Sequence, residues 1–193
     1  MRGGEIIYNF EELDGKTRKW MLEEFLSEEK SGNPYRSSRL SSSGITIFPT
    51  EMEKAIRNGN EETLANALSK PAYWQPSETY ERGGRNFIRR INPVKAAEFL
   101  ACTEFNTWYV RGFARRLIEE GEEYCQVYRA APAWKPRGEC LQHEGKIYTV
   151  QEVYKGHRAK YWPPPGNPNA FSIPVGTNCH HSIRRVPKSG LKD

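Results

Sequence analysis

The chain has few apolar residues and no long hydrophobic run. Only 37% of its 193 residues are hydrophobic, and the mean hydropathy is −0.80. No run approaches the roughly 18 apolar residues of a membrane span, and no apolar stretch of signal-peptide type follows the first residues. We therefore expect neither a membrane protein nor a secreted one. The length fits one domain, or one domain with an arm, and the low apolar content favours burial of surface against partners.

Cysteine is scarce, and the common nucleotide-binding patterns are missing. The four cysteines of an apparently intracellular chain predict reduced thiols or a metal site before a framework of disulfides. The sequence has neither a P-loop nor a GxGxxG segment after a predicted strand. Its glycines therefore give no support to a nucleotide-binding enzyme.

Charge is unevenly distributed along the chain. Residues 1–70 carry 10 basic and 12 acidic side chains, whereas residues 71–193 carry 19 basic and 12 acidic ones. Most of the basic excess lies in a Pro-rich tail, residues 158–193, with Arg158, Lys160, Arg184, Arg185, Lys188 and Lys192. Such a tail neutralises phosphates or an acidic protein surface, or simply keeps the protein in solution.

Helix caps predict a helical N-terminal region with an irregular arm over residues 1–90. The predicted helices run from Gly15 to Lys30, from Thr50 to Asn58 and from Asn60 to Pro71. Asp14 is a good N-cap for the first helix, and Thr50 with Glu53 forms a capping-box pattern for the second. Residues 73–90 show no regular pattern, so we expect an irregular boundary there.

Residues 91–193 predict a long helix, a small antiparallel sheet and extended ends. Asn92 as N-cap, Pro93 at the first helical position and Gly121 past the end are typical of one long helix. The other predicted elements are strands at 124–129 and 182–186, a short element at 146–150 and a short helix at 150–155. The Pro-rich residues 161–168 fit neither a helix interior nor a central strand. The predicted fold is therefore α+β, with the long central helix packed on the sheet.

A carboxylate falls in or beside the apolar stripe of the long helix. This residue is Glu104, one turn before Trp108. It is either partly exposed and in contact with water, or buried and paired with a cation, for which Arg111 and Arg129 are candidates. Cys102 in the same helix and Cys125 in the first of these strands are expected in the core.

The sharpest local pattern is a set of cysteines and histidines. Two residues separate Cys140 from His143, and Cys179, His180 and His181 follow one another. Zinc commonly takes four such ligands in two close pairs, so the pattern predicts a site of Cys140, His143, Cys179 and His181, or His180 in place of the last. Reduced core cysteines with surface histidines, and a disulfide between Cys140 and Cys179, are alternatives. A Cys–His enzyme is a further one, although no local signature orients a base.

Basic residues also alternate with aromatic ones. The segments are Arg85-Asn86-Phe87-Ile88-Arg89-Arg90 and Tyr161-Trp162. Such mixtures stack on bases and neutralise phosphates, although aromatic residues equally serve as core or interface anchors. The candidate contacts to nucleic acid or to an acidic partner are Arg85, Arg89, Arg90, Arg184, Arg185 and Lys188.

Several motifs together resemble a known family. They are Ala101-Cys102-Thr103-Glu104-Phe105-Asn106, Cys140-Leu141-Gln142-His143-Glu144-Gly145-Lys146 and Asn178-Cys179-His180-His181. Their order is similar to the C-terminal domain of the Mu F-like minor head proteins of tailed phages. The residues that fit that family's motif are Thr103, Glu104, Asn106, Cys140, Gly145 and Cys179. His143 and His181 stand where cysteines are common, and the histidine before the final cysteine is missing. Shorter motifs between Leu13 and Ala130 are similar to small phage and prophage proteins of head-gene neighbourhoods.

The resemblance implies a non-catalytic virion protein of the head or the head-to-tail connection, assembled in the host cytoplasm. Its expected partners are capsid, portal or neck subunits in multiple copies, with DNA as a further contact and no membrane. Glu104 and Asn106 would hold the long helix to the sheet, with Trp108 and Arg111 as further structural residues. Cys140, His143, Cys179 and His181 would clip the C-terminal half. The alternatives are a nucleic-acid-binding module that uses the basic C-terminal half, and the Cys–His enzyme.

Overall fold

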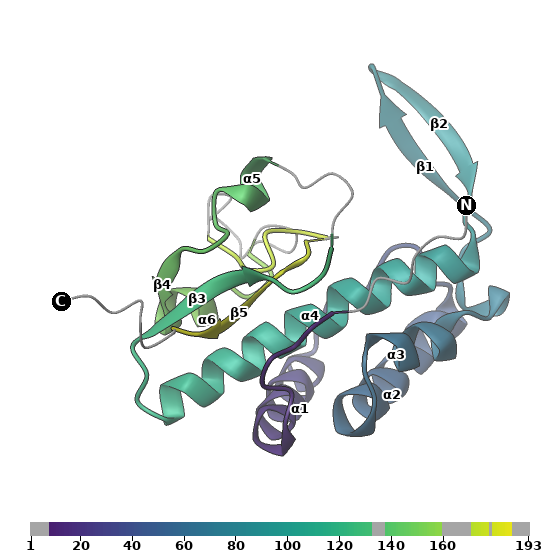
Figure 1. Ribbon diagram of the computed structural model, residues 1–193. Coiled ribbons are helices and arrows are strands. Elements are labelled where there is room, and N and C mark those ends of the chain that lie inside the picture. Colours follow the sequence, from purple (N-terminus) through teal and green to yellow (C-terminus); the bar gives the residue numbers. More distant parts are fainter. Residues whose placement is uncertain (1–7, 133–137, 160–170, 178, 187–193) are drawn as a thin grey trace.

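One long helix runs through the middle of the fold and separates a helical layer from a small sheet (Figure 1). The computed structural model describes residues 8–132, 138–159, 171–177 and 179–186. The predicted Pro-rich stretch at 161–168 lies outside these residues. The larger of two buried apolar clusters joins side chains from both sides of residue 90, from Met21 to Ile183. The predicted α+β class is confirmed.

Three helices form the N-terminal layer: α1 (Gly15–Lys30), α2 (Ser42–Asn58) and α3 (Glu61–Leu68). The predicted bounds of α1 are confirmed. At its start, the Asp14 carboxylate accepts hydrogen bonds from the amides of Lys16 and Thr17, as an N-cap should. The start of α3 is confirmed in the same way by Asn60, whose side chain accepts from the Thr63 amide at 2.9 Å.

The prediction for the start of α2 is wrong. The helix begins at Ser42, so Thr50 lies in its interior and Pro49 is accommodated within it. Ser41 is the N-cap, and its amide and hydroxyl donate to the carbonyls of Tyr73 and Ala72. The close approach requires a glycine at position 44, because a Cβ there would lie 2.1 Å from the Tyr73 carbonyl oxygen. Contacts with the 3₁₀ turn η1 (Pro71–Tyr73) thus fix the start of α2.

The boundary expected to be irregular is a β-hairpin. Strands β1 (Ser77–Arg82) and β2 (Arg85–Arg90) pair antiparallel, with Arg82 opposite Arg85. Gly83 and Gly84 both have positive φ, 58° and 73°, which is what a tight two-residue hairpin turn needs. The adjacent glycines are the local signal in the sequence for this turn. The hairpin projects away from the rest of the fold (Figure 1).

The central helix α4 (Pro93–Glu119) is confirmed, with the Asn92 side chain accepting from the Lys95 amide at 3.1 Å. It is buried on nearly all sides because α1 and α3 cover one side while α6 and β5 lie on the other. Even Arg116, in the last turn of the helix, is only 7% exposed. Its Nε donates to Glu120, four residues further along, at 3.0 Å.

The sheet has the strand order β4–β3–β5, antiparallel throughout. Its strands are β3 (Tyr124–Arg129), β4 (Ile147–Thr149) and β5 (His181–Arg185), each within one residue of the predicted bounds. Two short helices complete it, α5 (Gly138–Leu141) and α6 (Val150–Lys155). The predicted short helix at 150–155 is confirmed as α6, and Thr149 and Glu152 form a capping box at its start. Within the described part of the chain, no helix has both the length and the apolar character needed to cross a membrane.

Candidate metal centre

Three of the four predicted metal ligands meet in one buried cluster. Cys140 lies in α5, Cys179 precedes β5, and His181 is the first residue of β5. The Cys140 and Cys179 Sγ atoms are 3.9 Å apart, and Cys179 Sγ is 3.8 Å from His181 Nδ1. All three ligand atoms lie within 4.8 Å of one another, and all three residues are buried. Residues separated by about forty positions are therefore brought to metal-binding spacing.

These distances are close to those of a tetrahedral zinc site. With Zn–S bonds of about 2.3 Å and Zn–N bonds of about 2.0 Å, tetrahedral angles place two sulfurs about 3.8 Å apart and a sulfur and a nitrogen about 3.5 Å apart. The observed separations of 3.9 Å and 3.8 Å exceed these by about 0.1 Å and 0.3 Å. The third pair, Cys140 and His181, lies within 4.8 Å.

The ligand segment before β5 is held by two buried side chains. The Asn106 amide in α4 donates to the His181 carbonyl at 2.9 Å and to the Cys179 carbonyl at 3.4 Å. The Tyr8 hydroxyl donates to the same Cys179 carbonyl at 3.0 Å. Asn106 thus joins the long helix to the sheet edge that carries the ligands.

A carboxylate orients the histidine. His181 Nε2 lies 3.2 Å from Glu144 Oε2, and Arg129 also pairs with this carboxylate. The hydrogen bonds from Arg129 lower the pKa of Glu144, so the group is an ionised acceptor at neutral pH. An ionised carboxylate only accepts hydrogen bonds, so the His181 proton resides on Nε2. The lone pair on Nδ1 then faces the two sulfurs, as in a metal-ligating histidine.

The other two histidines are engaged elsewhere. His143, predicted as a ligand, is not in the cluster: its Nδ1 lies 2.7 Å from the Tyr148 hydroxyl, and its ring packs edge-on against Phe171. His180, the alternative to His181, points its Nδ1 at the Pro132 carbonyl at 2.6 Å. His180 directly precedes His181 at the start of β5, and neighbouring side chains of an extended segment leave it on opposite faces.

The Cys179 thiol is a poor nucleophile in this setting. The contact with Cys140 and then burial raise the pKa of Cys179 well above its ordinary value. The thiolate is the nucleophile in cysteine catalysis, so a protonated thiol does not favour the Cys–His enzyme. The two sulfurs are also unbonded, at 3.9 Å rather than the roughly 2.05 Å of a disulfide. Cys102 and Cys125 are buried core residues, and burial raises the pKa of each to about 12.

Glu104 is buried and paired, but with a partner that the sequence did not suggest. Its carboxylate receives two hydrogen bonds from Arg158, at 2.9 Å and 2.7 Å. Neither predicted partner is used, because Arg111 donates to Glu24 at 2.8 Å and Arg129 pairs with Glu144. Trp108 lies in the core, where it packs edge-on against Phe25 with ring centroids 5.3 Å apart.

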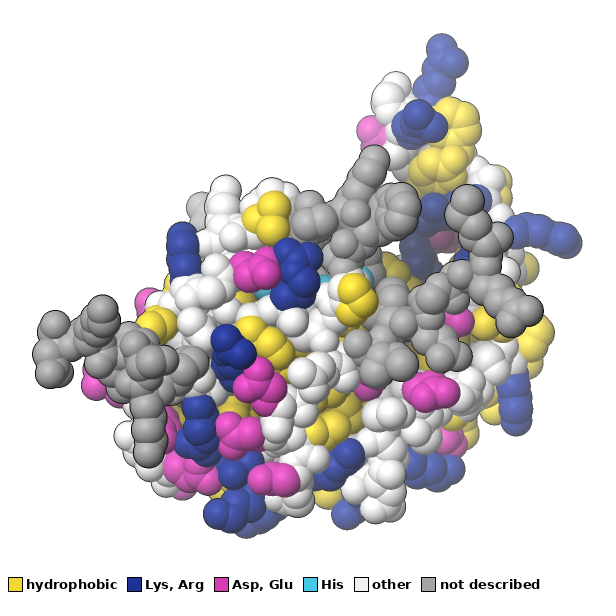
Figure 2. All heavy atoms as spheres, viewed as in Figure 1, with side chains coloured by type: hydrophobic (Ala, Val, Ile, Leu, Met, Phe, Trp, Pro, Cys, Tyr) yellow, Lys and Arg dark blue, Asp and Glu magenta, His cyan; other side chains and the backbone are white. Residues whose placement is uncertain are grey.

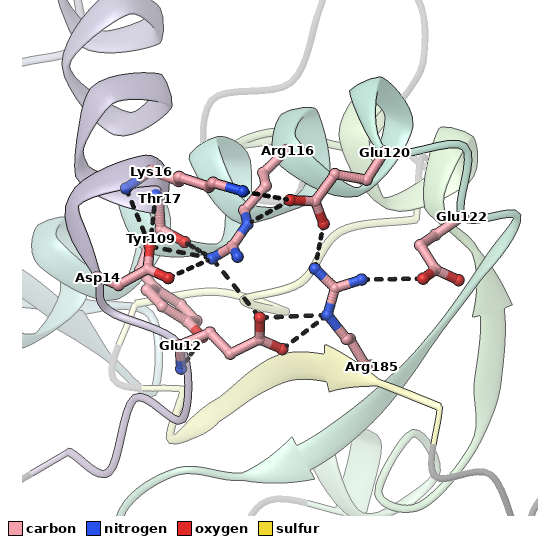
Figure 3. A network of polar contacts seen from close by, with 9 residues as sticks. All are labelled: Glu12, Asp14, Lys16, Thr17, Tyr109, Arg116, Glu120, Glu122 and Arg185. Carbon is pink, nitrogen blue, oxygen red and sulfur yellow. Dashed lines mark hydrogen bonds and ion pairs between the residues drawn. The ribbon is translucent and has the colours of Figure 1, made fainter.

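The described basic residues of 158–193 do not form the free basic tail that we predicted. Arg158 is buried, and Arg184 and Arg185 lie in β5, the predicted last strand, where both form ion pairs. Arg184 donates to Glu11 at 2.9 Å, and Arg185 reaches Glu12, Glu120 and Glu122, in a network continuous with Arg116 (Figure 3). These charges are neutralised within the chain. Lys188 lies outside the described residues.

The remaining predicted contact residues lie in the hairpin. Arg85, Arg89 and Arg90 all belong to β2 and are exposed. Arg89 donates to Glu78 at 2.5 Å, so one of the three is paired at the base of the hairpin. The hairpin therefore presents exposed arginines to solvent, whereas the arginines of β5 are held in ion pairs.

Comparison with known proteins gives no relative. No family model, no curated protein and no solved structure matches this chain. The phage resemblance therefore rests on the motif residues alone. Three of these, Asn106, Cys140 and Cys179, lie together in the structure around His181.

Proposed function

We propose that the chain is a structural subunit of a tailed-phage particle, located in the head or the head-to-tail connection, that acts through protein contacts. The expected partners are capsid, portal or neck subunits, in repeated copies. The observation that carries the proposal is the β1–β2 hairpin, which presents apolar and basic side chains to solvent outside the packed body (Figure 2).

The hairpin is unusually exposed for an ordered element. All residues of its two strands are exposed except Glu78, and Ile88 keeps 77% of its surface. Tyr80 and Phe87 stack across the strands with ring centroids 5.6 Å apart. A two-stranded hairpin on its own is at best marginally stable in water, and unpaired strand edges invite pairing with another chain. Such an element is better explained as a contact surface than as part of the fold.

The base of the hairpin is fixed to the body. Glu78 accepts from Arg39 at 2.7 Å and from Arg89 at 2.5 Å, and the Ile91 amide donates to the Pro76 carbonyl at 3.2 Å. A hollow of about 380 Å³ lies at this junction, lined in part by Lys95 and Phe99. A fixed base presents the tip in a defined direction, which suits assembly of identical subunits.

The gathering of motif residues supports the phage assignment. Asn106, Cys140 and Cys179 are far apart in the sequence, yet the fold brings them around one site. Chance matches to short motifs would not be expected to converge in space. The resemblance is thus supported by three motif residues that contribute to one site.

The test is incorporation into particles. Wild-type chain and the double variant Phe87→Ser, Ile88→Asp are produced with the capsid and portal proteins of the same phage, and purified particles are analysed by mass spectrometry. We expect the wild type in the particles and at least a tenfold loss of the variant. Ile45→Asp is the matched control, because Ile45 and Phe87 are both 42% exposed but Ile45 lies in α2. Absence of the wild type from particles, or full incorporation of the hairpin variant, overturns the proposal.

Nucleic-acid binding is a second candidate, and one observation favours the hairpin as its site. Arg85 and Arg90 are exposed there, whereas Arg184 and Arg185 are held in ion pairs. Neutralising a phosphate contact lowers the slope of log affinity against log salt by about 0.9 per charge. The candidate predicts this reduction for Arg85→Gln and for Arg90→Gln in DNA titrations. An unchanged slope in both variants would reject it.

A further inference from the structure

We propose that Cys140, Cys179 and His181 bind one Zn²⁺ ion, through two Sγ atoms and Nδ1, with Glu144 as the residue that positions His181. The ion would tie α5 to the start of β5. This site is independent of the proposed assembly role, because it lies in the sheet half of the fold and not in the hairpin.

The donor set selects the metal. Two thiolates and one imidazole are soft or borderline ligands that suit zinc and do not suit calcium or magnesium. The three donors come from buried residues, and Cys140 and Cys179 are 5% and 2% exposed. Binding exchanges two thiol protons for the ion, and both protons leave to solvent. The fold thus holds the ligands near their binding positions, and the ion would replace the weak contact between the Cys140 and Cys179 thiols.

The side chains that would orient the ligands already contact them. The Glu144 carboxylate accepts from His181 Nε2 at 3.2 Å and is itself held by Arg129. The carbonyls on either side of His180 are fixed by Asn106, at 3.4 Å to Cys179 and 2.9 Å to His181. Carboxylate–histidine–metal arrangements of this kind fix the tautomer and raise the basicity of the ligand. A buried pair of core cysteines has no need of such an arrangement.

His143 is not one of the ligands of this cluster. The His143 ring is turned to Tyr148, with 2.7 Å between Nδ1 and the hydroxyl, and the two rings lie 5.8 Å apart. Binding by His143 would require it to give up that contact. The described residues therefore supply three protein ligands, Cys140, Cys179 and His181.

The experiment measures zinc in the full chain, purified under reducing conditions in the presence of Zn²⁺. We expect one zinc per chain by elemental analysis for the wild type. The variants Cys179→Ser and His181→Ala should retain less than a tenth of it, and Cys125→Ser, a buried cysteine of the same sheet, should retain all of it. Glu144→Gln should bind zinc 10- to 100-fold more weakly in a competition with a chelator.

A second measurement does not depend on the stability of the variants. Cobalt replaces zinc in the wild-type chain, and its absorption spectrum should show sulfur-to-cobalt charge transfer and the strong ligand-field bands of tetrahedral coordination. His143→Ala should leave both the spectrum and the zinc content unchanged. Less than 0.2 zinc per folded, reduced wild-type chain, or a cobalt spectrum without thiolate bands, overturns the site. Loss of zinc in His143→Ala overturns the three-ligand assignment, and a Cys140–Cys179 disulfide in the native chain overturns the proposal as a whole.

Discussion

Arg158 and Glu104 face each other as a buried, two-pronged ion pair. The Arg158 guanidinium donates to the two carboxylate oxygens at 2.9 Å and 2.7 Å, and the residues are 3% and 0% exposed. Arg158 Nε also donates to Glu28 of α1 at 3.2 Å, and the guanidinium lies over the Trp108 ring at 4.9 Å. One side chain that follows α6 thereby joins α1 to α4.

Neutralising Glu104 should destabilise the protein. Glu104→Gln keeps the shape but leaves a buried guanidinium with one carboxylate fewer, which costs about 3 kcal/mol of unfolding free energy. Urea unfolding followed by circular dichroism measures this loss. Glu98→Gln is the control on the same helix, since Glu98 is exposed and should change stability by less than about 0.5 kcal/mol. Equal midpoints for the two variants would contradict the importance of the pair.

Stability should fall as the pH is lowered from neutral, because of His157. Burial lowers the pKa of His157 from 6.5 to about 4, although Nε2 lies 3.2 Å from a Glu28 oxygen. Between these two values the unfolded chain takes up a proton that the folded chain does not, so the free energy of unfolding falls with falling pH. The full window is worth up to about 3 kcal/mol. Urea unfolding at a series of pH values measures the slope.

His157→Gln removes that titration and should flatten the slope above pH 4. Below this pH a second loss should remain in the wild type, and it should be smaller in the variant, which lacks His157. The pKa of Glu28 is lowered to about 2, because its hydrogen bond with His157 and the charge of Arg158 outweigh the opposing effect of burial. Stability from Glu28 is present above its ordinary value of 4.5 and is lost as the pH falls towards 2. A variant with the wild-type slope above pH 4 would show that another group titrates there.

Local signals in the sequence predicted most of the elements. Four helices have an N-cap whose side chain accepts a hydrogen bond from a backbone amide two or three residues later: Asp14, Asn60, Asn92 and Thr149. Because donor and acceptor are so close in the sequence, these caps can be predicted from it. The start of α2 could not be read in this way. It depends on the contact of Ser41 with Tyr73, which only the folded chain creates.

The sequence predicted most of the residues of the candidate site, but not how their side chains are arranged. Cysteine and histidine spacing identified Cys140, Cys179 and His181, because such pairs are rare by chance in a chain with four cysteines. The exclusion of His143 and the use of Glu144 depend on side-chain directions that spacing does not determine. For the same reason, no pattern in the sequence indicated that Glu104 pairs with Arg158, which is 54 positions away.

A methyl group at Gly112 should separate two helices. A Cβ at this position would lie 2.5 Å from the Met21 amide nitrogen and 2.7 Å from its Cα, so α1 could not stay in place. We expect Gly112→Ala to lower the free energy of unfolding by about 1–3 kcal/mol, the usual cost of overpacking. Gly15→Ala is the control, because nothing lies within 4 Å of its added Cβ, and it should be neutral or slightly stabilising. Thermal unfolding distinguishes the two; an equal effect would contradict close helix contact.

Arg185 should contribute to stability and not to nucleic-acid binding. Its guanidinium joins the segment before α1, the end of α4 and the turn before β3, through Glu12 at 3.0 Å, Glu122 at 2.9 Å and Glu120 (Figure 3). Because several carboxylates share the one cation, Arg185→Gln should cost about 1 kcal/mol, more at low salt than at high salt. Thermal unfolding at two salt concentrations measures this.

The matched change is Arg85→Gln in the hairpin, where the side chain is exposed and stability should stay within about 0.5 kcal/mol of the wild type. The two variants separate a charge that holds the fold from a charge that faces outward. If Arg185→Gln weakened DNA binding while its unfolding temperature stayed unchanged, the network would be open to ligands rather than closed by Glu12, Glu120 and Glu122. The positive end of the chain would then be a binding surface, as its composition first suggested.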